Sequence, residues 1–176
     1  MPASSSPAVT ADLIAVAVRS IHAMADGDRA DFDILYHPQA VDRENSVQPP
    51  SSRVPGPAGF YSTALWLRAA FADLRYDIHD AAANGELVAV HSTMNGRHVA
   101  AWPIYTVEGD VDTVFPPTGK PFAMTQSHWF RVRDGKIIEH WANRDDFGMA
   151  KQLGWIPPTP AYLLTMALAK RRAARD

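Results

Sequence analysis

The last strand that the sequence predicts, residues 136–145, carries the side chains with the clearest chemical potential. Side chains alternate between the two faces of a strand, so its residues divide into two sets. One face consists of Ile137, Glu139, Trp141, Asn143 and Asp145. The other face consists of Ile138, His140, Ala142, Arg144 and Asp146. Whichever face meets the core places polar or ionisable groups beside apolar ones, which is costly unless each polar group finds a partner.

The functional interpretation of this pattern is that Trp141, Asn143 and Asp145 line a cavity. Asp145 would then be the catalytic acid or base. The alternative is that Asp145 and Asp146 only begin the turn after the strand, because aspartate is a common turn residue.

Two histidines, His128 and His98, are the other catalytic candidates. On the preceding strand, His128 and Phe130 share one face, whereas Trp129 lies on the other. His91 and His98 are an odd number of positions apart, so a regular strand points them to opposite faces and they should not share a metal ion. A single histidine is more often a hydrogen-bonded core or surface residue than a catalyst.

Motifs for other chemistries are absent from the sequence. There is no HExxH zinc motif, GxSxG nucleophile elbow, phosphate loop or GxGxxG turn. The chain contains no cysteine, which excludes thiol nucleophiles and thiolate metal sites. We therefore expect neither a metal nor a cofactor. The glycines of residues 56–59 could expose amide groups to an anion, but they are more typical of a plain helix entry.

The elements that must position these residues are helices first and paired strands later. Helical spacing of apolar residues predicts helices from Thr10 to about residue 26, at 32–36, at 59–74 and at 160–175. Extended segments are expected from Tyr76, at 87–98, at 121–132 and at 136–145, with loops at 45–57 and after His98. The dipeptides at 84–85 (Asn-Gly) and 134–135 (Asp-Gly) predict two tight hairpins. Strands joined by such turns are antiparallel, so the fold class is α+β.

Length and composition fit one globular domain. The chain has 176 residues, is 47% hydrophobic and carries a formal net charge of −2. We expect a disordered tail at 1–8, a single domain at 9–159 and a helical extension at 160–176. The basic side chains are scattered until Lys170, which disfavours nucleic acid as a partner. No apolar run is long enough to span a membrane and no signal peptide is evident, so we expect a cytoplasmic protein.

Several segments of the chain resemble the SnoaL-like polyketide cyclases, or ester cyclases, which belong to the superfamily shaped like nuclear transport factor 2. These segments lie at 56–60, 71–75, 96–98, 117–120, 130–141 and 152–154, together with Asp145. They cover about two thirds of the chain, in the order that the family has.

The resemblance implies a curved antiparallel sheet wrapped by helices into a cone, an α+β barrel that is usually dimeric. It implies that the aspartate matching Asp145 acts as general acid and base in an intramolecular aldol closure, without cofactor or metal. The substrate would be a small apolar molecule of the polyketide or ester-bearing carbonyl type. The residues expected around it are His98, His128, Asn143, Trp141, Trp129, Phe130, Trp102 and Phe60.

The sequence departs from the family in a longer segment at 101–115 and in the extension beyond Gly154. Two other functions stay open. One is epoxide hydrolysis, which in this superfamily normally uses an Asp-Arg-Asp arrangement, whereas Arg144 and its two neighbouring aspartates are adjacent in sequence. The other is a non-catalytic protein that binds a small ligand or serves as a dimeric scaffold.

Overall fold

The structure is a computed structural model that describes residues 7–175. Its helices are α1 (Pro7–Asp26), α2 (Arg29–Leu35), the short 3-10 helix η1 (Pro50–Ser52), α3 (Pro57–Ala70), α4 (Asp146–Leu153) and α5 (Pro160–Ala173). Its strands are β1 (Tyr36–Asp42), β2 (Phe71–Asn84), β3 (Leu87–His98), β4 (Trp102–Tyr105), β5 (Val111–Phe115), β6 (Pro121–Arg133) and β7 (Lys136–Arg144). The α+β class is confirmed.

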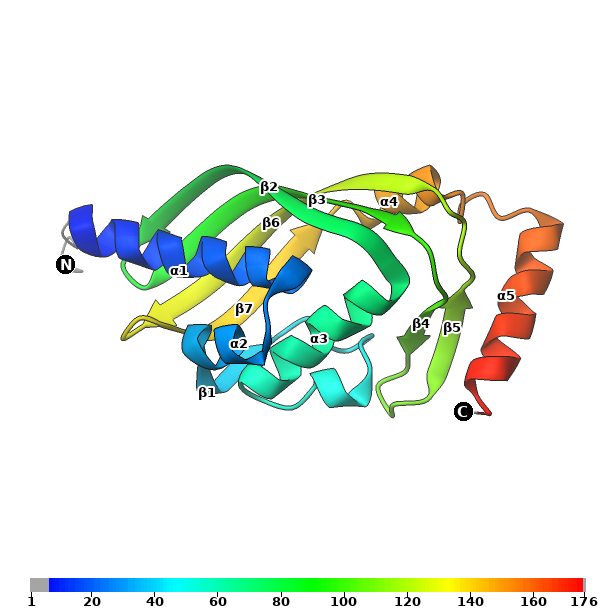
Figure 1. The fold of residues 1–176 in the computed structure, drawn as a ribbon, viewed down its shortest axis with the longest axis horizontal. Coiled ribbons are helices and arrows are strands. Elements are labelled where there is room, and N and C mark those ends of the chain that lie inside the picture. Colours follow the sequence, from blue (N-terminus) through cyan, green and yellow to red (C-terminus); the bar gives the residue numbers. More distant parts are fainter. Residues whose placement is uncertain (1–6, 176) are drawn as a thin grey trace.

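Five strands form one curved sheet in the order β1-β7-β6-β3-β2, and helices α1, α2 and α3 cover one of its faces (Figure 1). Strands β2, β3, β6 and β7 are antiparallel neighbours, but β1 runs parallel to β7. The expected purely antiparallel sheet is therefore corrected to a mixed one. Because β1 and β2 lie at opposite edges of the sheet, it is open and is not a closed barrel.

Strand β1 is the strand of the main sheet that the sequence did not predict. It contains Pro38, and proline within a strand is tolerated almost only at a sheet edge. Here β1 pairs only with β7, in a register that shifts between Tyr36 and Val41. The same pairing places Asp42 directly opposite His140.

The start of helix α3 is fixed on β1 by Gly56. This glycine has φ of 81°, and a Cβ atom there would lie 2.3 Å from the carbonyl oxygen of Pro38. Its amide donates a hydrogen bond to the carbonyl of Ala40 at 2.8 Å. The glycine-rich segment at 56–59 thus serves as a close-packed helix entry.

Both predicted hairpins are confirmed. Strands β2 and β3 pair from Asn84 opposite Leu87, and β6 and β7 are joined by Asp134 and Gly135, which both have positive φ. The longer segment at 101–115 was expected to be a loop, but it contains the separate two-stranded hairpin β4-β5.

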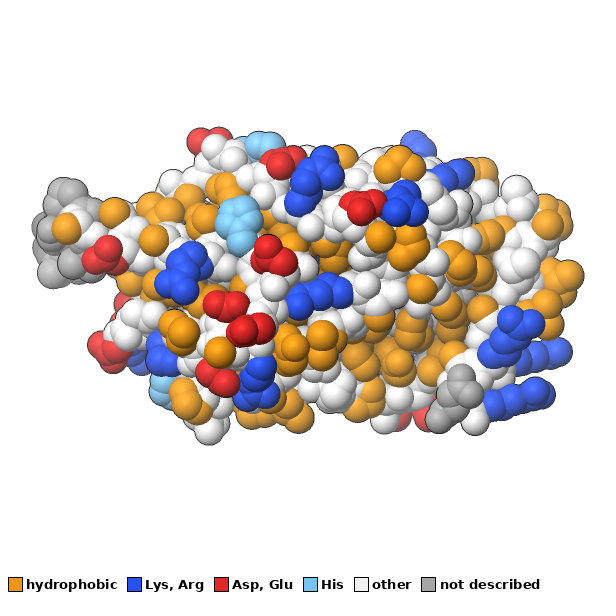
Figure 2. Space-filling view, viewed as in Figure 1, with side chains coloured by type: hydrophobic (Ala, Val, Ile, Leu, Met, Phe, Trp, Pro, Cys, Tyr) orange, Lys and Arg blue, Asp and Glu red, His pale blue; other side chains and the backbone are white. Residues whose placement is uncertain are grey.

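Helix α1 begins far from α5, which lies beside the β4-β5 hairpin (Figure 1). The predicted tail at 1–8 lies largely outside the described residues, and its residues 7 and 8 belong to α1. The terminal helix is confirmed as α5, which has no buried residue. Its C-terminal turn carries a group of basic side chains (Figure 2).

Candidate functional site

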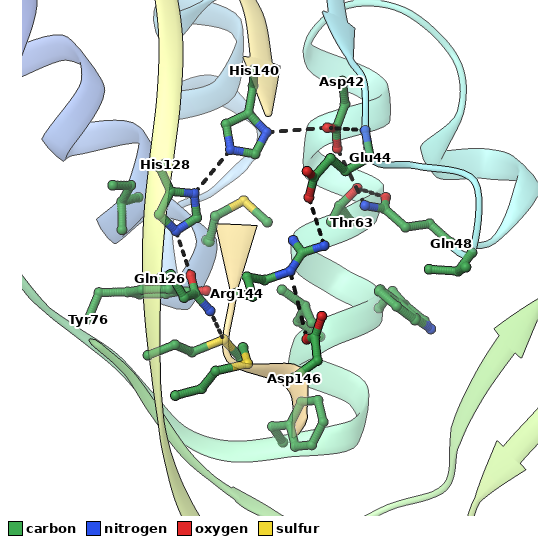
Figure 3. Close-up of a pocket in the computed structure, with 18 of the residues that line it drawn as sticks. Asp42, Glu44, Gln48, Thr63, Tyr76, Gln126, His128, His140, Arg144 and Asp146 are labelled. Atoms are coloured by element: carbon green, nitrogen blue, oxygen red, sulfur yellow. Dashed lines mark hydrogen bonds and ion pairs between the residues drawn. The ribbon is translucent and has the colours of Figure 1, made fainter. Parts of the chain in front are cut away.

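A cavity of about 380 Å³ lies between helices α1 and α3, the inner face of the sheet and the β4-β5 hairpin. One end is polar and is formed by side chains from β1, β6, β7 and the segment that follows β1 (Figure 3). The other end is aromatic and receives Trp66, Phe71, Trp102, Phe115 and Trp155. The cavity can therefore hold an apolar molecule with reactive oxygens at one end.

Strand β6 supplies the inner wall by simple alternation. Met124, Gln126, His128 and Phe130 are buried and line the cavity, whereas the residues between them are more exposed. This alternation is regular because β6 is central and pairs with β3 without a break from Pro121 to Arg131.

Strand β7 reaches the cavity through a β-bulge. Val132 of β6 pairs with Ile137, but the preceding residue Arg131 pairs with Glu139, so Ile138 is an extra residue. After this bulge the alternation is reversed. Ile137 is buried, yet it is His140 that lines the cavity, and Trp141 lies on the opposite face.

The polar end is organised by a chain of side-chain contacts (Figure 3). Asp42 Oδ1 lies 3.3 Å from Nδ1 of His140, whose Nε2 lies 3.1 Å from Nδ1 of His128. His128 Nε2 lies 2.5 Å from Oε1 of Gln126. The Gln126 amide nitrogen donates to the sulfur of Met94 at 3.3 Å, and this sulfur is a weak acceptor.

Asp42 is held as a carboxylate. Burial opposes its ionisation, but the hydrogen bond and charge of His140, the amide of Glu44 and the charge of Arg144 outweigh burial and lower its pKa. Its second oxygen accepts from the amide of Gln48 at 3.4 Å, and Gln48 accepts from the Thr63 hydroxyl at 2.6 Å.

His128 is held as a neutral imidazole. Burial disfavours its charged form, the charges of His140 and Arg144 act in the same direction, and its pKa lies well below the ordinary value. A neutral imidazole has one nitrogen with a lone pair, so it can accept a proton.

Arg144 is the cation of the cavity. Its guanidinium lies 2.9 Å from Glu44 Oε2 and 3.9 Å from Asp146 Oδ1, and its side chain is 29% exposed. Figure 3 shows it between the two carboxylates. The segment after β1 and the start of α4 thus bring together acids that are a hundred residues apart in sequence.

Four of the residues predicted around the site line the cavity: His128, Phe130, Trp102 and Phe60. Trp102 contacts Trp66, Phe71 and Trp155, with ring centroids 5.0, 5.1 and 5.6 Å apart. The segment at 101–115, singled out as a departure from the family, therefore builds the aromatic end.

The expected burial of Asp145 is wrong. Asp145 is exposed, does not line the cavity and is the N-cap of α4, where its side chain accepts from the Gly148 amide at 2.9 Å. The space beside Gly148 is filled by this carboxylate, since a Cβ atom there would lie 2.0 Å from Asp145 Oδ2. The alternative given by the sequence, that Asp145 begins the next element, describes its structural position.

The other predicted residues also lie outside the cavity. Trp129 and Trp141 stack on the outer face of the sheet, with centroids 6.3 Å apart and planes inclined by 6°, and Asn143 is exposed. His98 is fully buried between Phe71 and Trp155, and burial lowers its pKa. It does not line the cavity.

Sequence reasoning assigned no site role to Asp42, His140, Gln126 or Arg144. His140 and Arg144 belonged to the alternative face of the last strand, so the pattern contained them but pointed to the wrong face. Gln126 shares the face of His128 on β6, a signal that could have been used. No local sequence pattern points to Asp42, because its place in the site depends on the pairing of β1 with β7.

Neither a metal cluster nor a membrane helix emerges from the described part of the chain. Within residues 7–175, no group of three or more histidine, aspartate or glutamate side chains could hold a metal ion. No helix in the same range is long and apolar enough to cross a membrane.

Comparison with known sequences gives a family match over most of the chain. The model of the family described as SnoaL-like polyketide cyclase matches residues 15–153. The aklanonic acid methyl ester cyclase DnrD of Streptomyces peucetius is 33% identical over 106 residues, which cover 60% of this chain and 66% of that protein. The nogalonic acid methyl ester cyclase of Streptomyces nogalater is 31% identical over 100 residues, 56% of this chain and 67% of that protein. For the DauD cyclase of Streptomyces sp. strain C5, the match spans only 60% of its length.

Solved structures share the fold. TsrD from Streptomyces laurentii has a TM-score of 0.65 at 23% identity and covers 82% of this chain and 96% of its own. Wild-type IdmH from Streptomyces antibioticus has a TM-score of 0.60 at 28% identity and covers 81% of this chain and 98% of its own.

Proposed function

The chain belongs to the SnoaL-like polyketide cyclase family, and from this premise we propose that it closes a ring in a polyketide-type ester, with His128 as general acid and base. The observation that carries the proposal is the buried imidazole of His128 in the wall of a largely apolar cavity, where burial lowers its pKa and favours the neutral form. The amide oxygen of Gln126 lies 2.5 Å from the cavity-side nitrogen of His128, Nε2, and can accept from this nitrogen once it has taken up a proton.

The proposed reaction needs one proton acceptor that later becomes the donor. His128 Nε2 removes a proton from a carbon flanked by carbonyl groups, and the resulting enolate attacks a second carbonyl carbon of the same molecule. A carbon–carbon bond forms, the carbonyl π bond breaks, and the new alkoxide takes the proton back from Nε2. The product is an isomer of the substrate, so the sequence needs no other reactant. A positioned acid or base of this kind accelerates a reaction about 100- to 10,000-fold.

Two neighbouring groups can stabilise the negative oxygen. The amide nitrogen of Gln126 donates to the sulfur of Met94, a weak acceptor, so a substrate oxygen is a better acceptor for it. The Arg144 guanidinium faces the same cavity and adds a positive charge. Donors fixed before the reaction are effective because they need not reorganise when charge develops.

The aromatic end would fold the substrate. Ring closure requires the two reacting carbons of a flexible chain to meet. When binding already holds them in contact, less entropy is lost on reaching the transition state, and the barrier is lower. The aromatic walls and the methionines around the cavity offer an apolar surface that can adapt to a polycyclic or extended molecule.

The substrate class is proposed from the relatives, whose names describe cyclases of two methyl esters. The test is to incubate the purified chain with nogalonic acid methyl ester and with aklanonic acid methyl ester. We expect at least one to be converted into a product of unchanged mass with one more ring. If both esters are bound and recovered unchanged, the cavity belongs to a non-catalytic binding protein.

A second candidate, epoxide hydrolysis, is favoured by one arrangement. Arg144 lies between the carboxylates of Glu44 and Asp146, which resembles the acid-arginine-acid set expected for that reaction. Incubation with limonene oxide in isotopically labelled water separates the two functions. Hydrolysis places the label in a diol, whereas ring closure by His128 places none.

A further inference from the structure

Three strands bring a carboxylate and two imidazoles into a line that ends at the cavity. Asp42 and His140 are directly paired residues of the parallel strands β1 and β7. His128 lies diagonally from His140 on the same face of the antiparallel pair β6 and β7, where side chains two positions apart can touch. The two contacts, 3.3 and 3.1 Å, join three residues that no local motif connects.

The hydrogen-bond pattern allows a single extra proton in this line. In the protonated pair, Gln126 accepts from Nε2 of His128, so the neutral His128 accepts at Nδ1 and His140 donates both to His128 and to Asp42. Moving one proton across the 3.1 Å contact makes His140 neutral and His128 charged. The two states therefore differ only in which imidazole carries the charge.

The surroundings favour the charge on His140. The Asp42 carboxylate contacts His140 and is fixed by the Glu44 amide and by Gln48. Arg144, from β7, and the hydroxyl of Tyr36, from β1, are the other ionisable groups near Asp42. Arg144 is largely paired with Glu44, and the Phe60 ring of α3 meets the His140 ring edge to face, at a centroid distance of 6.2 Å. His128, by contrast, contacts no carboxylate among residues 7–175.

We infer that Asp42 and His140 form a proton relay behind His128, in which His140 carries the proton and Asp42 is the positioning residue. The inference rests on the proposed function for its place in the reaction. In the base form of the pair both rings are neutral, His128 carries its proton on Nδ1, and its Nε2 has the lone pair. When Nε2 takes a proton from the substrate, the Nδ1 proton passes to Nε2 of His140, which gives the protonated pair. The His140 imidazolium is stabilised by Asp42, and the same protons return when the alkoxide is protonated. No proton is gained or lost over the cycle.

The relay can be tested without substrate, by nitrogen NMR of the histidine rings in the wild-type chain between pH 5 and 9. The seven histidines are assigned with single histidine-to-glutamine variants. In the protonated pair we expect both nitrogens of His140 and only Nε2 of His128 to carry protons. As the pH rises, the nitrogens of both rings should change in one common step. Independent titration of the two rings would overturn the relay, whatever the outcome of the turnover assay.

Asp42→Asn adds the charge test, with Asp73→Asn as the matched control. Asp73 is an exposed residue that pairs with Arg97 away from this cavity. We expect Asp42→Asn to move the common step to lower pH by about 1 to 3 units, because a carboxylate in contact favours the charged imidazole by that amount. Asp73→Asn should leave the pH of the common step unchanged. In the turnover assay, the acid limb of the kcat/KM profile should shift by the same amount, whereas a merely structural role lowers the rate without moving the limb.

Discussion

His128 and His140 face each other on the cavity side of strands β6 and β7, with their Nδ1 and Nε2 atoms 3.1 Å apart. Their juxtaposition depends on the bulge at Ile138, which turns His140 toward the cavity and Trp141 away from it. Asp145 directly follows the strand and caps α4. One extra residue therefore decides which ionisable groups of β7 can meet a substrate.

The cap at Asp145 predicts an effect on stability. Asp145→Ala should lower the free energy of unfolding by about 1 kcal/mol, because the Gly148 amide loses its acceptor. Asp145→Asn should be close to wild type, since asparagine caps helices as well as aspartate does. Urea denaturation at pH 7 measures both changes. An Asp145→Ala variant as stable as the wild type would contradict the capping role.

The buried neutral His128 predicts how stability depends on pH. Its pKa in the native state is lowered by burial and by nearby positive charges, whereas in the unfolded chain it titrates near about 6.5. Below that pH the unfolded chain binds a proton that the native His128 does not. The free energy of unfolding should therefore fall with decreasing pH, by up to about 1.4 kcal/mol per pH unit.

His98 contributes in the same direction, because burial lowers its pKa as well. His128→Gln should therefore reduce the slope of the unfolding free energy against pH between pH 7 and pH 5. The part of the slope that comes from His98 should remain. Urea titrations at pH 7, 6 and 5 give the slopes. An identical slope in the variant and the wild type would mean that His128 is not held neutral.

The two faces of the sheet predict different roles for two tryptophans. Trp102→Leu removes part of the aromatic end, and we expect KM for the ester to rise about tenfold, equivalent to about 1.4 kcal/mol of lost apolar contact. Trp141→Leu, on the outer face beside Trp129, should leave KM unchanged. Steady-state kinetics of the pair test the placement. Equal effects of both substitutions on KM would contradict it.

Much of the fold follows from local signals in the sequence. The Asp134-Gly135 turn and the turn at Gly85 and Glu86 fix two hairpins, because Asp134, Gly135 and Gly85 have positive φ, which few other residues adopt at low cost. The first and last helices follow from apolar spacing. Strand β1 escapes because Pro38 argues against a strand unless the strand is known to lie at an edge. The edge position of β1 becomes evident only from the order of the strands in the folded sheet.

The site was less accessible to sequence reasoning. Alternation correctly placed His128 and Phe130 on one face of β6. On β7, Ile137 is buried, and regular alternation from it places Trp141, Asn143 and Asp145 inside. The bulge at Ile138 reverses this assignment, and a bulge in a run of ordinary strand residues leaves no clear mark in the sequence. Asp42 was missed because its position depends on a pairing with a strand almost a hundred residues later.

The central claim is that His128, and not Asp145, moves the proton. The most direct measurement compares kcat of His128→Gln and Asp145→Asn on the ester that the wild type converts, after unfolding curves confirm that both variants are folded. We predict a loss of about 100- to 10,000-fold for His128→Gln, and a rate within about twofold of the wild type for Asp145→Asn. The reverse result, with His128→Gln active and Asp145→Asn inactive, would contradict the account.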